Sequence, residues 1–335
     1  MTVPDASRRS ARRRRWLGPL LVGTATLLAA CQPAARTITV PISSWPGFEY
    51  LGLAADLAVD QRHGLDLEVV QFADPQEIVH AYLRGEQPIA PLTTVEAVDL
   101  CERVPNRCPV VVLVLDESRG GDQLAVHNAV SSIADLRGRT VAVTFSTLGP
   151  YVVDRALAKQ GLHIGDVTLR NMPLDRMADA LARAEVAAAA LFSPYSERAL
   201  RDGHSRMLFT SREIPGEIFD VLVVDPHYLK AHAKEVALLV HSWQGAHQFA
   251  QRDPKRAVAL MARREQVSEE AFKASEEGLV YFPLAEQVAM LEPGGVIAQS
   301  LRHVHALQQH LGLSGGDAPL PRTTDAAVKQ AMLLP

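Results

Sequence analysis

The chain has 335 residues, of which 47% are hydrophobic and 21% charged, enough apolar material for one large or two medium domains. Thirty-four lysines and arginines stand against 38 aspartates and glutamates, so the formal net charge is −4 at pH 7. Proteins that bind nucleic acids carry basic stripes or patches, and this balance argues against that class of partner.

The first thirty residues have the pattern of an export signal. Six arginines between Arg8 and Arg15 precede an apolar run that ends in small residues at Ala29 and Ala30. A basic region, an apolar region and small residues at a cut site are typical of a secretory signal peptide. The apolar run is too short for a membrane-spanning helix, which needs about twenty apolar residues. We therefore predict that residues 1–30 are a signal peptide.

Cys31 directly follows these small residues. The arrangement resembles a bacterial lipobox, which implies cleavage before Cys31 and transfer of lipid to its side chain. The rest of the protein is then expected to be exported and anchored to a membrane, facing the periplasm or the cell exterior. The alternative is a chance cysteine after an ordinary signal peptide. The arginine run leaves the general and the twin-arginine export routes open.

Strand-like and helix-like segments alternate in the next part of the chain. Strands are expected at 37–42, 67–72, 88–92 and 110–115, and helices at 51–61, 75–84 and 94–102. Residues 110–115 are wholly apolar, as in a strand that is buried on both faces of a parallel sheet.

Cys101 and Cys108 form a close pair in this first part. An even number of cysteines in an oxidising compartment favours a disulfide bond. A metal site with two cysteine ligands is the alternative, although no histidine lies nearby in the sequence to complete it.

A polar segment with two glycines, 116–122, precedes a second alternating part. Strands are expected at 124–126, 140–144, 167–171, 187–192, 206–209 and 219–224, with helices at 150–160, 174–185 and 194–202 between them. From Asp225 onward the chain is nearly all helical and has too few strands for a sheet of its own. We predict an α/β fold in which residues 36–116 and 225–335 form one lobe and residues 122–220 the other. Two crossing segments would join the lobes around a ligand cleft.

Conventional catalytic and metal-binding motifs are missing. The chain has neither a phosphate-binding loop ending in Gly-Lys-Ser/Thr nor a His-Glu-x-x-His motif. A Gly-x-Ser-x-Gly segment occurs at 312–316, but no histidine follows it, as a hydrolase of that type would require. His303 and His310 are too far apart on a helix to chelate one ion. We expect no enzymatic activity, no cofactor and no metal site.

Residues suited to ligand binding follow the predicted strands, and ligands of open α/β sheets bind at such strand ends. The candidates are aromatic, hydroxyl and carboxylate side chains: Trp45, Phe48, Glu49, Thr93, Thr94, Asp116, Ser118, Ser146, Thr147, Phe192 and Tyr195. The aromatic rings would supply buried area, and hydroxyl and N–H groups would fix orientation. Alternatively, Trp45 and Phe48 only plug the edge of a lobe, and Ser146 and Thr147 belong to an ordinary helix start.

The charges of these loops do not identify the ligand. Glu49, Asp116 and Asp122 are acidic, and Arg119 is the one basic residue in the candidate loops. A sulfonate or nitrate would have to rely on N–H and hydroxyl donors. An amine or a nitrogen heterocycle suits aromatic rings and carboxylates equally well, and we slightly favour it.

Four segments, 45–49, 116–122, 132–142 and 192–195, together resemble the solute-binding proteins of the nitrate/sulfonate/taurine (NMT1/THI5-like) class of ABC importers. The resemblance implies a two-lobed periplasmic-binding fold of type II. It also implies a monomeric, lipid-anchored protein that captures a small molecule and delivers it to an ABC permease and its ATPase. Such proteins often have Trp-Glu where this chain has Phe192 and Ser193, so a ligand contact by a glutamate is not implied here.

Two other readings of the same sequence stay open. The first is a lipoprotein that senses a solute or acts as a scaffold without transport. The second is an enzyme of the thiamine-pyrimidine synthase type, which shares this fold. That family's cysteine-rich iron motif has no counterpart in this chain, and the enzyme is therefore disfavoured.

Overall fold

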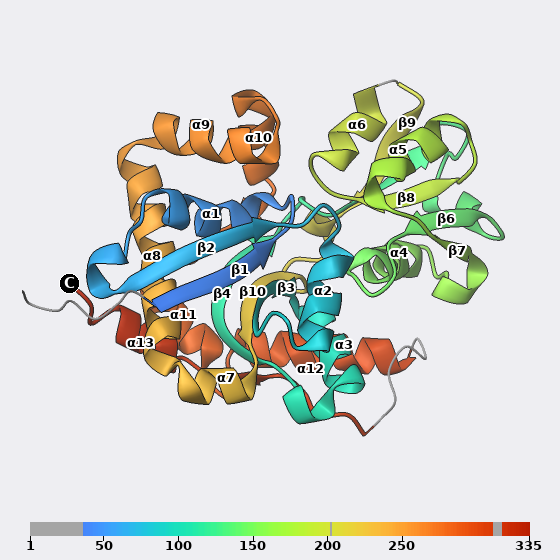
Figure 1. The fold of residues 1–335 in the computed structure, drawn as a ribbon. Helices are drawn as coiled ribbons and strands as arrows, with labels where there is room; N and C mark the ends of the chain where they lie inside the picture. Colours follow the sequence, from blue (N-terminus) through green and yellow to red (C-terminus); the bar gives the residue numbers. More distant parts are fainter. Residues whose placement is uncertain (1–35, 202, 311–316) are drawn as a thin grey trace, which may run out of the picture. The chain divides into compact units, whose positions relative to one another are not determined.

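A computed structural model describes residues 36–201, 203–310 and 317–335, and Figure 1 shows how their helices and strands are arranged. The predicted signal peptide and the predicted lipidation of Cys31 lie outside these residues. Within the described part, no helix is both long and apolar enough to cross a membrane.

The first large sheet has the strand order β11-β4-β10-β3, with β12 beside β4. Its strands are β3 (Ile89–Thr93), β4 (Val110–Ser118), β10 (Phe219–Val224), β11 (Leu279–Val280) and β12 (Arg322–Thr323). β4 is buried along its whole length, as predicted, but it runs antiparallel to β10. The expectation of a parallel sheet is therefore wrong here. An apolar run reports burial on both faces, whereas strand direction depends on the connections, and β10 arrives from the second sheet.

Two strands and three helices complete the N-terminal part. β1 (Arg36–Ile42) pairs in parallel with β2 (Leu65–Gln71), and the helices are α1 (Glu49–Asp56), α2 (Pro75–Arg84) and α3 (Thr94–Arg103). The Asp74 side chain caps α2 by accepting a hydrogen bond from the backbone N–H of Gln76. Pro75 fits the first turn because its missing N–H would be unpaired there.

The second large sheet has the order β7-β6-β8-β5-β9. Its elements are β5 (Gln123–His127), β6 (Thr140–Val143), β7 (Thr168–Asn171), β8 (Ala188–Leu191) and β9 (Ser205–Thr210), with α4 (Gly149–Ala158), α5 (Leu174–Ala182) and α6 (Tyr195–Arg201). β6 is parallel to β7 and β8, while β5 is antiparallel to β8 and β9. Between β5 and β6, Ile133–Leu136 forms a single 3-10 turn, which begins with a capping box at Ser132.

The C-terminal third is helical and packs on the side of the first sheet. It contains α7 (Pro226–Ala231), α8 (Ala233–Arg252), α9 (Pro254–Glu265), α10 (Glu269–Glu276), α11 (Leu284–Leu291), α12 (Val296–His310) and α13 (Ala326–Ala331). α8 contacts α1 and α13, α11 contacts β4, and α12 contacts α3. The apolar stripe of α8, which includes Val236, Val240 and Trp243, is buried. The tail therefore buries its apolar faces against the earlier part of the chain.

The chain passes between the two large sheets at 119–122 and again at 211–218. Ser211 joins these two crossing segments, because its Oγ lies 2.8 Å from Ser118 Oγ and accepts a hydrogen bond from the Gly120 N–H at 2.7 Å. Gly278 packs directly against them. A Cβ at Gly278 would lie 2.7 Å from the backbone nitrogen of Gly121, so this contact needs a glycine.

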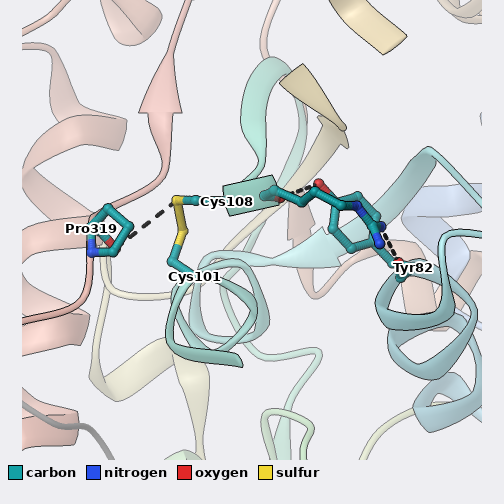
Figure 2. The surroundings of a disulfide bond; sticks show 5 residues. Tyr82, Cys101, Cys108 and Pro319 are labelled. Carbon is teal, nitrogen blue, oxygen red and sulfur yellow. Dashed lines mark hydrogen bonds between the residues drawn. A yellow bond between two sulfur atoms is a disulfide. The ribbon is translucent and has the colours of Figure 1, made fainter. Parts of the chain in front are cut away.

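The predicted disulfide is confirmed. Cys101 near the end of α3 is bonded to Cys108, seven residues later, which excludes the two-cysteine metal site. Cys108 Sγ also lies 4.0 Å from the carbonyl oxygen of Pro319, so the disulfide touches the C-terminal segment (Figure 2). Between the cysteines, the Arg107 carbonyl accepts a hydrogen bond from Tyr82 Oη at 2.8 Å.

Candidate functional site

A pocket lies between segments that follow β1 or belong to the first large sheet and its helices on one side, and segments of the second large sheet and its helices on the other. One side includes Ser43, Trp45, Phe48, Thr93, Glu96 and Asp220, and the other includes Asp122, Thr144, Thr147, Gly149 and Phe192. The cavity volume is about 60 Å³. A single water needs about 10–15 Å³, so the pocket has room for a compact organic molecule.

Five of the eleven sequence-predicted ligand residues line this pocket: Trp45, Phe48, Thr93, Thr147 and Phe192. The rings of Trp45 and Phe192 meet edge to face with centroids 5.5 Å apart. Because these two rings come from opposite sides of the pocket, they close one wall of it together. This position favours the ligand-binding interpretation over a plug at a lobe edge. Ligand contact by these residues stays a prediction.

Glu49, by contrast, is turned away from the pocket. It is fully buried, and its Oε2 accepts a hydrogen bond from Arg264 Nε at 2.8 Å. Burial raises the pKa of Glu49 to about 7, although the nearby Arg264 guanidinium acts in the opposite direction. The structure therefore gives Glu49 a role in joining α1 to α9. Arg264 lies 215 positions after Glu49, so no local sequence pattern predicted this pair.

Five other predicted residues lie close to the pocket without lining it. Asp116 accepts a hydrogen bond from Trp45 Nε1 at 3.2 Å, and Ser118 pairs with Ser211. Thr94 is the buried first residue of α3. Ser146 lines a neighbouring cavity, with its Oγ 3.4 Å from Arg103, and Tyr195 Oη donates to the Ala73 carbonyl at 3.5 Å. A direct ligand contact by any of them is a prediction that this geometry does not support.

Two acidic residues in the pocket wall escaped the sequence analysis, Asp220 and Glu96. Asp220 on β10 stands in register with Asp116 on β4 and with Thr93 on β3. Asp220 was visible as the single charged residue in an otherwise apolar strand. Glu96, three positions after Thr93, has the spacing of a capping box.

The carboxyl groups around the pocket are buried close to one another. Burial raises the pKa of Glu96, Asp116 and Asp122 to about 7. It raises the pKa of Asp220 well above its usual value, and the neighbouring acids Asp116, Asp122 and Glu96 raise it further. The residues that line the pocket include no lysine, arginine or histidine.

The starts of α3 and α4 both face the pocket but differ in capping. Thr93 Oγ1 accepts from the Glu96 N–H at 3.2 Å, and Glu96 Oε2 accepts from the Thr93 N–H at 2.8 Å. A carboxylate thus already occupies the favourable electrostatic position at the start of α3. The N-cap of α4, Leu148, makes no such side-chain hydrogen bond.

Asp60, His63 and His241 form a group whose donor atoms lie within 4.8 Å of one another, close enough to hold a metal ion. Hydrogen bonds account for this spacing. The Nδ1 atoms of His63 and His241 lie 2.7 and 2.8 Å from Asp60 Oδ1, and Ser242 Oγ donates to Oδ2 at 2.7 Å. The group ties the segment after α1 to α8, and none of its residues lines the pocket.

The sequence model of the NMT1-like family matches residues 50–263. The chain belongs to this family. The match covers the second sheet, β3, β4 and β10, and therefore the carboxyl groups of the pocket; Trp45 and Phe48 precede it. No curated protein matches the sequence.

Solved structures show which fold this NMT1-like chain has. The alkanesulfonate-binding protein SsuA from Xanthomonas axonopodis pv. citri, bound to MOPS, matches with a TM-score of 0.69 at 17% identity, over 90% of this chain and 99% of that one. The ligand-binding component of an ABC-type import system from Staphylococcus aureus, with zinc bound, matches with a TM-score of 0.71 at 14% identity, over 88% and 99%. The periplasmic nitrate-binding protein NrtA from Synechocystis PCC 6803 gives 0.66 at 12% identity, over 89% and 86%. These matches confirm the predicted periplasmic-binding-protein fold.

Proposed function

We propose that this protein is an extracytoplasmic solute-binding protein, which captures a small molecule in the pocket and delivers it to an ABC importer. One observation carries the proposal: the pocket is walled from two sides by segments of different sheets, and the chain crosses between these sheets twice. Such a body opens and closes as a hinge around its ligand. The structural relatives that are named for sulfonate and nitrate binding have the same fold.

We further propose that export and a lipid on Cys31 hold the protein at a membrane, where a permease can meet it. The basic and apolar leader and the small residues before Cys31 support this. Since a binding protein returns its solute unchanged, we expect no chemical turnover.

A ligand screen combined with an uptake assay tests the proposal. A small molecule that binds only the native state stabilises the protein and so raises its melting temperature. At a hundredfold excess over Kd, the free energy of unfolding increases by about 2.7 kcal/mol. We expect one compound class to do so, to be recovered unchanged, and to be taken up more slowly by cells that lack the protein. Binding with unchanged uptake would indicate a sensor or scaffold instead, and chemical conversion of the compound would indicate an enzyme.

A further inference from the structure

The charge of the pocket narrows the class of its ligand. We propose that the pocket takes a compact organic cation with N–H donors, an amine or an amidine, and not a sulfonate or nitrate. The inference rests on the proposed function and specifies the solute for the same site.

In each of two carboxyl side chains in the pocket wall, one oxygen has no hydrogen-bond partner. Asp122 is 5% exposed and Asp220 is 2% exposed, and in each of them Oδ2 makes no hydrogen bond. Both residues line the pocket. A buried acceptor without a donor is costly, and a charged one more so. A ligand that brings positively charged N–H groups would supply the missing donors and the missing charge together.

The surroundings offer an anion no comparable partner. Glu96 adds a third carboxyl to the pocket wall, and Asp116 lies directly behind it. Nearby arginines are engaged elsewhere: Arg264 pairs with Glu49 and Asp56, and Arg119 with Glu117. A sulfonate would therefore be placed among like charges with no basic side chain in the lining.

A helix start is the usual alternative site for an anion. At α3 that position is filled from within the chain, because the Glu96 carboxylate accepts the Thr93 N–H. At the start of α4 the N-cap residue Leu148 has no capping side chain, although Thr147 Oγ1 accepts a hydrogen bond from the Gly149 N–H at 3.5 Å. This helix start faces the same acidic wall, since Gly149 and Thr147 line the pocket together with Asp122 and Asp220.

The rest of the wall suits the body of an organic cation. Trp45, Phe48 and Phe192 present aromatic surface. The electron-rich faces of aromatic rings attract cations and also bury apolar area. The cavity volume of about 60 Å³ suits a compact molecule.

The pH dependence of binding separates the two ligand classes. The ionisable groups facing Asp220 are Asp116 on β4, Asp122 before β5 and Glu96 on α3, and Asp116 also faces Glu117 and Tyr281. All of them are acidic. Because a cation needs ionised carboxylates, its affinity should increase as Glu96, Asp116 and Asp122, whose pKa burial raises to about 7, lose their protons. An anion held by protonated carboxyl groups should bind more weakly over the same range.

Calorimetric titration of the natively processed protein with matched probes tests the proposal. The probes are propylamine, benzylamine and benzamidine, set against propanesulfonate, benzenesulfonate, nitrate and the neutral benzyl alcohol. We expect at least one cation to bind about tenfold or more tightly than its matched anion, as hydrogen bonds to charged groups provide. Its affinity should rise severalfold from about pH 6 to about pH 8, while the probe stays protonated.

Two variants localise the effect. Asp122→Asn and Asp220→Asn keep the size of each side chain and remove its charge, so each should weaken cation binding about tenfold or more. Asp175→Asn is the control, since Asp175 is an exposed acid next to the pocket residue Leu174. Melting curves of all three establish that the variants are folded.

Tighter binding of a sulfonate or nitrate would overturn the proposal, as would the absence of binding by every amine and amidine. Full cation binding by folded Asp122→Asn and Asp220→Asn together would overturn it too. If an anion bound and Trp45→Ala abolished that binding, the ligand class would be wrong but the proposed solute-binding function would stand.

Discussion

At the scale of single residues, Trp45 connects the pocket wall to the buried acids behind it. Its Nε1–H donates to Asp116 Oδ2 at 3.2 Å, and its ring packs on Phe192. Two glycines make room for this arrangement. A Cβ at Gly47 would lie 1.8 Å from Asp116 Oδ2, and a Cβ at Gly121 would lie 2.7 Å from the Trp45 ring. Since backbone and carboxylate crowd the indole, its position is tightly determined.

We predict that Trp45→Ala weakens binding of the cognate ligand by about 2 kcal/mol or more, as loss of a central aromatic anchor does. Trp45→Phe should weaken it less, because a ring remains although the N–H donor to Asp116 is gone. Calorimetry measures both. Trp243→Phe is the control, since Trp243 is a buried tryptophan of α8 outside the pocket lining. Equal affinity of Trp45→Ala and the wild type would refute the site assignment.

The buried acids also predict how stability depends on pH. Their pKa values lie near 4 in the unfolded chain, whereas burial raises those of Glu96, Asp116 and Asp122 to about 7 in the native state. Between these values the native state binds more protons, so each group lowers stability as pH rises from about 4 to about 7. Buried His247, whose pKa is lowered to about 3, acts in the opposite direction between about pH 3 and pH 6.5.

We therefore predict that Asp122→Asn becomes more stable relative to the ligand-free wild type as pH rises from about 5 to about 8. The variant lacks one group that must lose its proton in a buried site, and both proteins share the His247 contribution. Chemical unfolding at several pH values measures the difference. A difference that is constant with pH, or that shrinks toward pH 8, would contradict the burial of an ionisable Asp122.

At the scale of elements, α3 is fixed at both ends by local chemistry. The capping box of Thr93 and Glu96 defines its start, and the disulfide from Cys101 to Cys108 turns the chain back after its last turn. The same segment leads into β4, the central apolar strand of the first sheet. The disulfide thus stabilises the turn between α3 and β4, and neither cysteine lines the pocket.

We predict that the double variant Cys101→Ser/Cys108→Ser loses about 2–3 kcal/mol of stability, the value expected for closing so short a loop in the unfolded chain. Ligand affinity should change little. Denaturant unfolding and calorimetry measure the two effects, with the reduced wild-type protein as a second control. Free alkylation of both thiols in denatured, unreduced protein would show that the bond does not form.

At the scale of the whole described chain, a few small side chains hold the two crossing segments together. Ser211 is fully buried, and it links Ser118 with the backbone of Gly120. Gly278 closes against the same place from the C-terminal part. Opening and closing of the pocket would have to alter backbone angles in these segments, because the sheets themselves are rigid.

We predict that Ser211→Ala lowers stability by about 1–3 kcal/mol, since it leaves the Gly120 N–H without its acceptor. It should also speed hydrogen exchange in both crossing segments and change ligand affinity. Ser205→Ala is the matched control. Ser205 is a buried serine of β9, and its Oγ donates to the Ala199 carbonyl of α6, away from the crossing segments. If both variants had the same exchange rates and affinities, the crossing segments would not act as the hinge.

Local features of this protein were predictable from its sequence because they depend on neighbours along the chain. Asp74-Pro75 and Asp253-Pro254 mark helix starts, and both aspartates cap their helices in the structure. The disulfide followed from the close spacing of its cysteines. The ordered segments that resemble solute-binding proteins led to the right fold.

Contacts between distant segments were decided only by the tertiary structure. The pairing of β4 with β10 is antiparallel, contrary to the expected strand direction, and it places Asp220 beside Asp116, 104 positions away in the sequence. Likewise, Glu49 points away from the pocket because it accepts a hydrogen bond from Arg264, which lies 215 positions later in the chain. Hydrophobic periodicity shows that a residue is buried but does not show which residue lies next to it. The sequence therefore determined the elements and the family of folds, while the chain crossings brought the carboxyl groups together around the pocket.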